Sequence, residues 1–144
     1  MILNTRHTGI VVRDLDRAIG FYEGLGLRLW RREMETGSFI EQVTGLPDVR
    51  LEWAKLKAPD DSLVELLQYH SHPVNAPHEV PPAHAHGCSH IAFTVADVET
   101  ACARVKELGG TVTNPPALSP DKRACVVYGR DVDGIIIELV EEKK

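Results

Sequence analysis

This chain of 144 residues lacks the features that mark membrane, nucleic-acid-binding and disulfide-rich proteins. No stretch approaches the roughly 20 consecutive apolar residues of a membrane span, so no membrane partner is expected. The net charge is -5 and no run of Lys and Arg occurs, which argues against a nucleic-acid partner. The cysteines Cys88, Cys102 and Cys125 form no Cys-x-x-Cys pair and are expected to be reduced thiols of a cytoplasmic protein. Residues 1–4 lead directly into the first predicted strand, which leaves no room for a signal peptide.

The composition that remains is that of an ordinary globular domain. Hydrophobic residues make up 43% of the chain and charged residues 26%. A chain of this length is long enough to bury a hydrophobic core and corresponds to one domain. We therefore expect a single domain over residues 1–144.

A phrase that occurs twice is the most informative feature of the sequence. One copy runs from His7 to Ala18 and the other from His90 to Ala101. Both read His, any residue, a small residue, two residues, Val, any residue, Asp, an aliphatic, an acid, any residue, Ala. Each half also contains a later glutamate between aliphatic residues, Glu65 in the first and Glu138 in the second. The repetition indicates two copies of one module, with module 1 over about residues 5–70 and module 2 over about residues 88–142.

Hydrophobic periodicity predicts the same order of elements in both halves. In the first, a strand over residues 8–12 precedes a helix over about 15–23, capped by Asp14 and followed by Gly24 and Gly26. The second repeats this with a strand over 91–95 and a helix that begins after Asp97. The later strands are expected at 27–31, 49–57 and 63–69, and at 111–113, 124–128 and 135–140. Residues 38–44 fit either a helical turn or an active-site lid.

This order of elements predicts the fold class and the domain plan. It is α+β, with two tandem βαβββ modules that form a cupped mixed sheet with the helices on its outer face. The Pro- and His-rich residues 70–87 are predicted to be a linker over the surface. Adventitious metal binding by its histidines, rather than a second metal site, is the favoured interpretation; they are His70, His72, His78, His84 and His86.

Alternation along the strands places the repeated His and Glu residues on one face. His7 and Gly9 share a face that Ile10 does not, and His90 and Ala92 share a face opposite Ile91. Glu65 and Glu138, each between core-facing aliphatics, are expected on the same face as the histidines. A single strand His or Glu is more often structural or solvated, but the coincidence in both halves favours a metal site. Two imidazoles and two carboxylates suit a six-coordinate divalent ion with two open positions.

The repeated unit, residues 14–27 and the Asp131-Val132-Asp133-Gly134 turn before Glu138 resemble the vicinal oxygen chelate superfamily. That superfamily includes glyoxalase I, methylmalonyl-CoA epimerase, extradiol dioxygenases and bleomycin-resistance proteins. The resemblance covers essentially the whole chain, although Val132 stands where the family usually has proline. It implies a likeness to bacterial glyoxalase I and the epimerase in ligand pattern. The four metal-ligand positions of the family fall on His7, Glu65, His90 and Glu138.

The resemblance also implies a reaction. One divalent ion, Ni, Co, Zn or Mn with Fe as a further option, would act as a Lewis acid on the enediolate or enolate of a small carbonyl or thioester substrate. Glu138 and Glu65 are then the candidate catalytic bases of an isomerase or lyase. Two alternatives stay open at this point: an Fe(II)- or Mn(II)-dependent dioxygenase of extradiol type, and a metal-free protein that binds an antibiotic. A homodimer is expected, with the site formed within a chain or across the dimer interface.

Several residues are candidates for contacts with the substrate. Lys122 and Arg123 precede a predicted strand near the metal ligands, and Tyr69 and Tyr128 fit either the lining of the cup or core packing. An anionic substrate would be held by basic side chains, for which the candidates are Arg6, Arg13, Arg32, Arg50, Lys122, Arg123 and Arg130.

Overall fold

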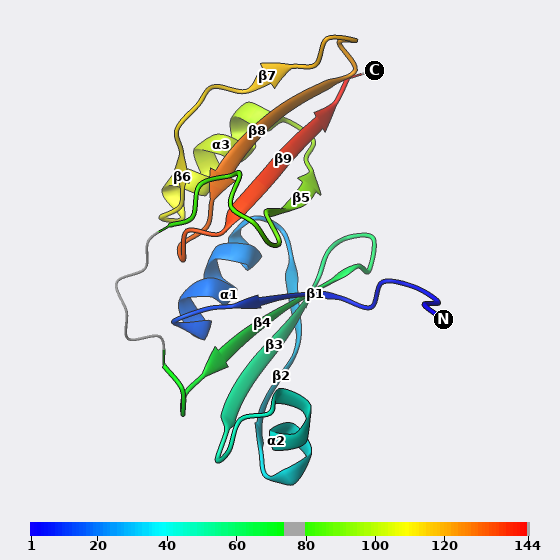
Figure 1. The fold of residues 1–144 in the computed structure, drawn as a ribbon. Coiled ribbons are helices and arrows are strands. Elements are labelled where there is room, and N and C mark those ends of the chain that lie inside the picture. Colours follow the sequence, from blue (N-terminus) through cyan, green and yellow to red (C-terminus); the bar gives the residue numbers. More distant parts are fainter. Residues whose placement is uncertain (74–79, 144) are drawn as a thin grey trace. The chain divides into compact units, whose positions relative to one another are not determined.

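The computed structural model describes residues 1–73 and 80–143 and divides the chain into two units, residues 1–77 and 78–144. The boundary between the units falls inside the predicted linker. Each unit contains one sheet, and a long helix follows its first strand, as in the βαβββ order that the sequence predicts (Figure 1). The fold is therefore α+β, built from two tandem βαβββ modules.

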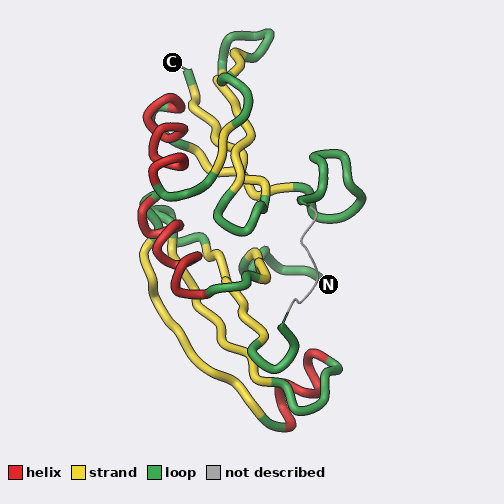
Figure 2. Tube along the Cα trace, turned by 90° about the vertical axis from the view of Figure 1, so that its left-hand side faces the viewer, coloured by secondary structure: helices red, strands yellow, loops and turns green. Residues whose placement is uncertain are grey.

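Unit 1 is a four-stranded sheet with the strand order β1-β4-β3-β2. Strands β1 (Thr8–Val11) and β4 (Leu63–Tyr69) are parallel, whereas β3 (Arg50–Lys57) is antiparallel to both β4 and β2 (Arg28–Thr36). Helix α2 (Ser38–Thr44) connects β2 to β3, so the segment left open between helical turn and lid is helical. It lies at the far end of the β2–β3 pair from α1 (Leu15–Gly24), as Figure 2 shows.

Unit 2 repeats this plan with the strand order β5-β9-β8-β6. Strands β5 (His90–Thr94) and β9 (Ile136–Glu142) are parallel, and β8 (Ala124–Arg130) is antiparallel to β9. Strand β6 (Thr111–Val112) and an extra short strand, β7 (Ala117–Leu118), both pair with β8. Helix α3 (Val98–Glu107) follows β5 as α1 follows β1.

Both helices begin at the aspartates that the sequence predicts. Arg17 N–H donates to the Asp14 carboxylate at 2.9 Å, and Thr100 N–H donates to Asp97 at 2.7 Å. Each cap satisfies a backbone donor that the first turn of a helix leaves without a partner. The apolar stripe of α1 is buried against the sheet, with Leu15 1% exposed.

The two faces of each sheet differ in polarity. In unit 1, Ala54, Leu56 and Leu66 are fully buried on the side that α1 covers. Burial of each large aliphatic of this kind contributes about 1.5–3 kcal/mol. The opposite side carries His7, Gly9 and Glu65, and we call it the histidine face. In unit 2, Ile137 and Leu139 face α3, and the histidine face carries His90, Ala92 and Glu138.

Several strands extend beyond their predicted ends. Strand β2 was predicted to end at Arg31 but continues to Thr36, because its charged residues pair along the whole of β3 after a register shift at residue 30. Strand β8 continues to Arg130 and β9 to Glu142, and β7 was not predicted. The Asp131–Gly134 turn is present: the Asp131 carboxylate, 4% exposed, accepts from Asp133 N–H and Ile135 N–H at 2.9 Å each.

Candidate metal centre

The first His–Glu pair lies on the histidine face of unit 1. Gly9 of β1 is directly across from Glu65 of β4, and His7 precedes β1 by one residue. His7 Nε2 is 2.9 Å from Glu65 Oε2. The side chains are 28% and 12% exposed, so the pair is accessible but largely shielded from water. A Cβ at position 9 would lie only 3.3 Å from Leu67 Cδ1, so glycine avoids a tight contact there.

The second pair repeats this arrangement in unit 2. His90 is the first residue of β5, and the small Ala92 lies directly across from Glu138 of β9. His90 Nε2 is 3.1 Å from Glu138 Oε2, with the side chains 30% and 23% exposed. The structure thus brings together one imidazole and one carboxylate in each unit.

The geometry of both pairs fits a divalent metal ion. Bonds from His nitrogen or carboxylate oxygen to such an ion are about 2.0–2.2 Å, so neighbouring ligands at right angles lie about 3.0 Å apart. The observed nitrogen–oxygen separations are 2.9 and 3.1 Å. Within either unit, the described residues form no larger group of His, Cys, Asp and Glu, so each unit supplies two donors. Each pair therefore has the spacing of two neighbouring ligands of one ion.

The groups around the two pairs differ. In unit 2, His90 Nδ1 lies 3.1 Å from Ser89 Oγ and 3.3 Å from Tyr128 Oη, and the Tyr128 ring packs 4.9 Å from the imidazole. These oxygens can accept the Nδ1 hydrogen, which leaves Nε2 free to bind a metal. In unit 1, His7 Nδ1 is buried without a hydrogen-bond partner among the described residues. In unit 1 the neighbouring side chain contacts the glutamate rather than the histidine: Lys55 Nζ is 3.3 Å from Glu65 Oε1.

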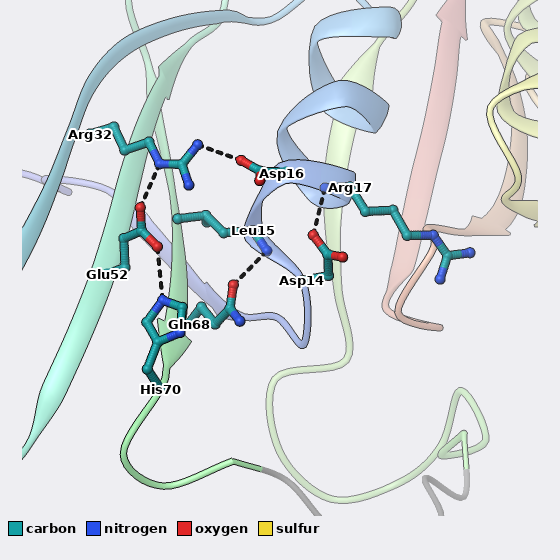
Figure 3. Close-up of polar contacts among 8 residues, drawn as sticks. All are labelled: Asp14, Leu15, Asp16, Arg17, Arg32, Glu52, Gln68 and His70. Atoms are coloured by element: carbon teal, nitrogen blue, oxygen red, sulfur yellow. Dashed lines mark hydrogen bonds and ion pairs between the residues drawn. The ribbon is translucent and has the colours of Figure 1, made fainter.

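A network of charged residues on the opposite face anchors α1 to the sheet (Figure 3). Glu52 accepts from Arg32 Nε at 2.7 Å and lies 2.8 Å from His70 Nε2, and Arg32 also donates to Asp16 at 2.5 Å. Hydrogen bonds from Arg32 and, to a smaller extent, from His70 hold the pKa of Glu52 below its ordinary value. The carboxylates of Glu52 and Asp16 raise the pKa of Arg32. Leu15 N–H donates to the Gln68 side chain at 2.8 Å. Arg32, a candidate for an anionic substrate, therefore has a structural role.

The remaining predicted substrate residues lie in different surroundings. Lys122 and Arg123 are in the exposed turn before β8, where Lys122 has a left-handed φ of 61°. Arg123 is five residues before Tyr128, or about 17 Å along the strand. Arg130 donates to the carbonyl oxygens of Gly134 at 2.7 Å and Pro81 at 2.9 Å, which fixes the turn before β9. Tyr69 packs against the buried cluster of Ile40, Val49 and Leu51.

The linker histidines that the structure describes are not gathered into a site. His70 belongs to the network with Glu52, and His72 Nδ1 is 2.8 Å from Ser71 Oγ. His84 and His86 are exposed, and His78 lies outside the described residues.

A cavity of about 300 Å³ lies at the ends of β1 and β4. It is lined by Val11, Val12, Arg13, Gln68, Tyr69, His70, His72 and Pro73.

Sequence reasoning missed Lys55. A lysine between the fully buried Ala54 and Leu56 has to point to the opposite face of its strand, which is the histidine face. The available signal was this alternation, but the register that places Lys55 across from Glu65 is visible only in the sheet.

Comparison with known proteins identifies the family of this chain. The family model for the glyoxalase/bleomycin resistance protein/dioxygenase superfamily matches residues 5–139. This chain belongs to that superfamily. A lactoylglutathione lyase of Haemophilus influenzae is 30% identical to it, over 95% of this chain and 91% of that protein. The family model spans both modules and includes all four predicted ligand positions of this glyoxalase superfamily member.

Solved structures share the fold. A glyoxalase family protein from Bacillus cereus has a TM-score of 0.91 and 32% identity, with 100% of this chain and 97% of that chain covered. The fosfomycin resistance protein FosX from Listeria monocytogenes, solved with Mn(II) and sulfate, has a TM-score of 0.63 and 16% identity over 99% of this chain and 95% of that one. No helix in the described part of this superfamily member is long and apolar enough to cross a membrane.

Proposed function

We propose that this protein is a divalent-metal-dependent lyase or isomerase of glyoxalase type that acts on a small carbonyl or thioester substrate. The observation that carries the proposal is the repeated His–Glu pair, with nitrogen–oxygen distances of 2.9 and 3.1 Å on the histidine faces of the two modules. The relative of Haemophilus influenzae named lactoylglutathione lyase supports a hemithioacetal as the first substrate to test.

His7, Glu65, His90 and Glu138 are proposed to hold one ion of Ni, Co, Zn or Mn. When bound, such an ion supplies a Lewis acid that polarises a substrate carbonyl and lowers the cost of removing the proton next to it. The Mn(II) in the FosX structure is support for a divalent ion in this fold. The two carboxylates match the ion in charge, and the two imidazoles complete a ligand set that leaves positions for substrate oxygens.

The two glutamates differ in how tightly their carboxylates are engaged. Glu65 Oε2 contacts His7 and its Oε1 contacts Lys55, so both oxygens have partners. Among the described residues, Glu138 has one such partner, His90, and its side chain is more exposed. Glu138 is therefore the better candidate for the base that takes a proton from the substrate carbon, and Glu65 for a fixed ligand.

The four residues are proposed to act together in a homodimer, either within one chain or with module 1 of one copy and module 2 of the other. A mixture of His7→Ala and His90→Ala proteins, unfolded and refolded together, distinguishes these arrangements. Two copies that share each site would form one intact site per mixed dimer and recover activity. A site within one chain would recover none.

The activity test uses metal-free protein to which Ni, Co, Zn or Mn is added back, with the hemithioacetal of methylglyoxal and glutathione, then acyl-CoA thioesters. We expect metal-dependent turnover, and a loss of at least about 100-fold in Glu138→Gln, the usual size of a general-base contribution. Glu142→Gln, on the same strand, is the matched control. Full activity in Glu138→Gln, or uptake of oxygen with catechols in place of isomerisation, would contradict the proposal.

A further inference from the structure

Lys55 occupies the position directly across from a proposed metal ligand. In the antiparallel β3–β4 register, Lys55 pairs with Glu65, and both side chains project to the histidine face. The ammonium lies 3.3 Å from Glu65 Oε1, while His7 lies 2.9 Å from Glu65 Oε2. The two oxygens of one carboxylate thus face two different groups.

The ammonium of Lys55 also packs against the Trp53 ring. Its Nζ lies 4.4 Å from the centre of the Trp53 ring, which is favourable for a cation over an aromatic face. Trp53 is 7% exposed, and its indole N–H donates to Glu35 at 2.8 Å. The Lys55 side chain is itself only 22% exposed. The Trp53 ring and the Glu65 carboxylate together restrict the Lys55 side chain to this position.

The second module has a different residue at the equivalent position. Tyr128 lies directly across from Glu138 in the β8–β9 register, as Lys55 lies across from Glu65. Its hydroxyl contacts His90 Nδ1 at 3.3 Å. The repeat therefore places a charged group on the glutamate in module 1 and a neutral group on the histidine in module 2.

We propose that Lys55 is a positioning residue that makes Glu65 a one-oxygen metal ligand. The ammonium retains Oε1, so Oε2, which already faces His7, is the oxygen left for the ion. This inference rests on the proposed metal site. Its consequence is that Lys55 limits metal affinity, since a positive charge on the ligand carboxylate repels a divalent cation. Without Lys55, both oxygens of Glu65 become available to the ion.

The test is titration of the metal-free full chain with Co(II), which reports affinity and coordination through its visible absorption spectrum. Lys55→Met is compared with Lys57→Met, a close control. Lys57 is two residues along the same strand, 25% exposed, lies 4.9 Å over the Trp30 ring and pairs with Asp61 at 3.0 Å. Lys55→Arg keeps the positive charge and a donor for Oε1, and Lys55→Gln provides a second neutral variant.

We expect Lys55→Met and Lys55→Gln to bind Co(II) about tenfold more tightly and with an altered spectrum, as loss of a nearby like charge predicts. Lys55→Arg and Lys57→Met should resemble the wild type. If Lys55→Met and Lys55→Gln match Lys57→Met in both affinity and spectrum, or bind more weakly with an unchanged spectrum, the role of Lys55 is refuted and the metal site stands. If the wild type binds no Co(II), the proposed function fails and this inference fails with it.

Discussion

Replacement of Glu52 by glutamine should destabilise unit 1 in a pH-dependent way. The Glu52 side chain is 17% exposed and links β3 to Arg32 of β2 at 2.7 Å and to His70, the residue after β4, at 2.8 Å. Arg32 in turn contacts Asp16 of α1. Glutamine keeps the size of the side chain and removes the charge, so the variant isolates the electrostatic contribution of the network.

The expected magnitude follows from the exposure of the partners. An isolated ion pair on the surface contributes about 0.2–1 kcal/mol. Glu52 makes two such contacts and is mostly shielded, whereas Arg32 is 35% exposed and partly screened by solvent. The loss at neutral pH should therefore be about 1–2 kcal/mol in the free energy of unfolding, and a melting temperature lower by about 3–6 °C.

The pH dependence has a definite sign. The pKa of Glu52 is lowered in the folded state from an ordinary value of 4.5. Stabilisation is therefore fully present above that value and is lost as the pH falls through the lower folded pKa. Wild type and Glu52→Gln should differ at pH 7, and the difference should shrink as the pH falls below 4.5 and through the lower folded pKa of Glu52.

The assay is urea unfolding followed by circular dichroism across this pH range. Glu107→Gln is the control, because Glu107 is 65% exposed and, in the described part of the chain, pairs with Arg104 on the same helix. A Glu52→Gln deficit that is the same at pH 3 and pH 7, or no larger than that of Glu107→Gln, would refute the reasoning.

Two further predictions concern unit 2. Tyr128→Phe keeps the ring against His90 but removes the hydroxyl oxygen that contacts His90 Nδ1. Co(II) affinity should therefore fall by about threefold to tenfold, because Ser89 still contacts Nδ1. Tyr69→Phe should leave Co(II) affinity unchanged, and an equal loss in both variants would contradict a role of Tyr128 in orienting His90. Asp131→Ala leaves the N–H groups of Asp133 and Ile135 without their acceptor at a buried turn, so the free energy of unfolding should fall by about 2–3 kcal/mol in urea denaturation. Asp133→Ala should cost clearly less, and equal losses would show that the Asp131 carboxylate does not hold the turn.

Much of the fold follows from local sequence signals. The helices α1 and α3 begin at Asp14 and Asp97 because a short acidic side chain caps them, and glycines follow both. Strand β4 matches its prediction at both ends because a run of apolar residues is interrupted only by Glu65 and Gln68. These elements depend on residues close in sequence, so periodicity and capping are sufficient to find them.

Other elements depend on a partner strand. The charged residues between positions 31 and 35 give the second half of β2 no apolar strand pattern in the sequence. This half is a strand because β3 pairs with it along its length. Strand β7 has two residues, and only their pairing with Val126 and Cys125 defines them as a strand. Such features arise from tertiary pairing and overrule the local preference of the residues.

The residues of the candidate site were likewise predictable from sequence only in part. The repetition of the motif identified His7, Glu65, His90 and Glu138, and the structure brings them together as two pairs. The contact of Lys55 with Glu65 depends on the register between β3 and β4, which sequence does not specify. Arg32 was a candidate for binding an anionic substrate or a solvated surface charge, and its ion pairs could not be predicted because its partners lie 16 and 20 positions away in the chain.

Metal content is the most direct test of the central claim that two His–Glu pairs hold one catalytic ion. Protein purified without an affinity tag and dialysed against a mild chelator would be analysed for bound elements, with His7→Ala, Glu138→Ala and His84→Ala alongside. The account predicts about one Ni, Co, Zn or Mn per site in the wild type and in His84→Ala, and a sharp loss in the other two. Equal metal content in all three variants, or a folded wild type that takes up no divalent ion, would contradict it.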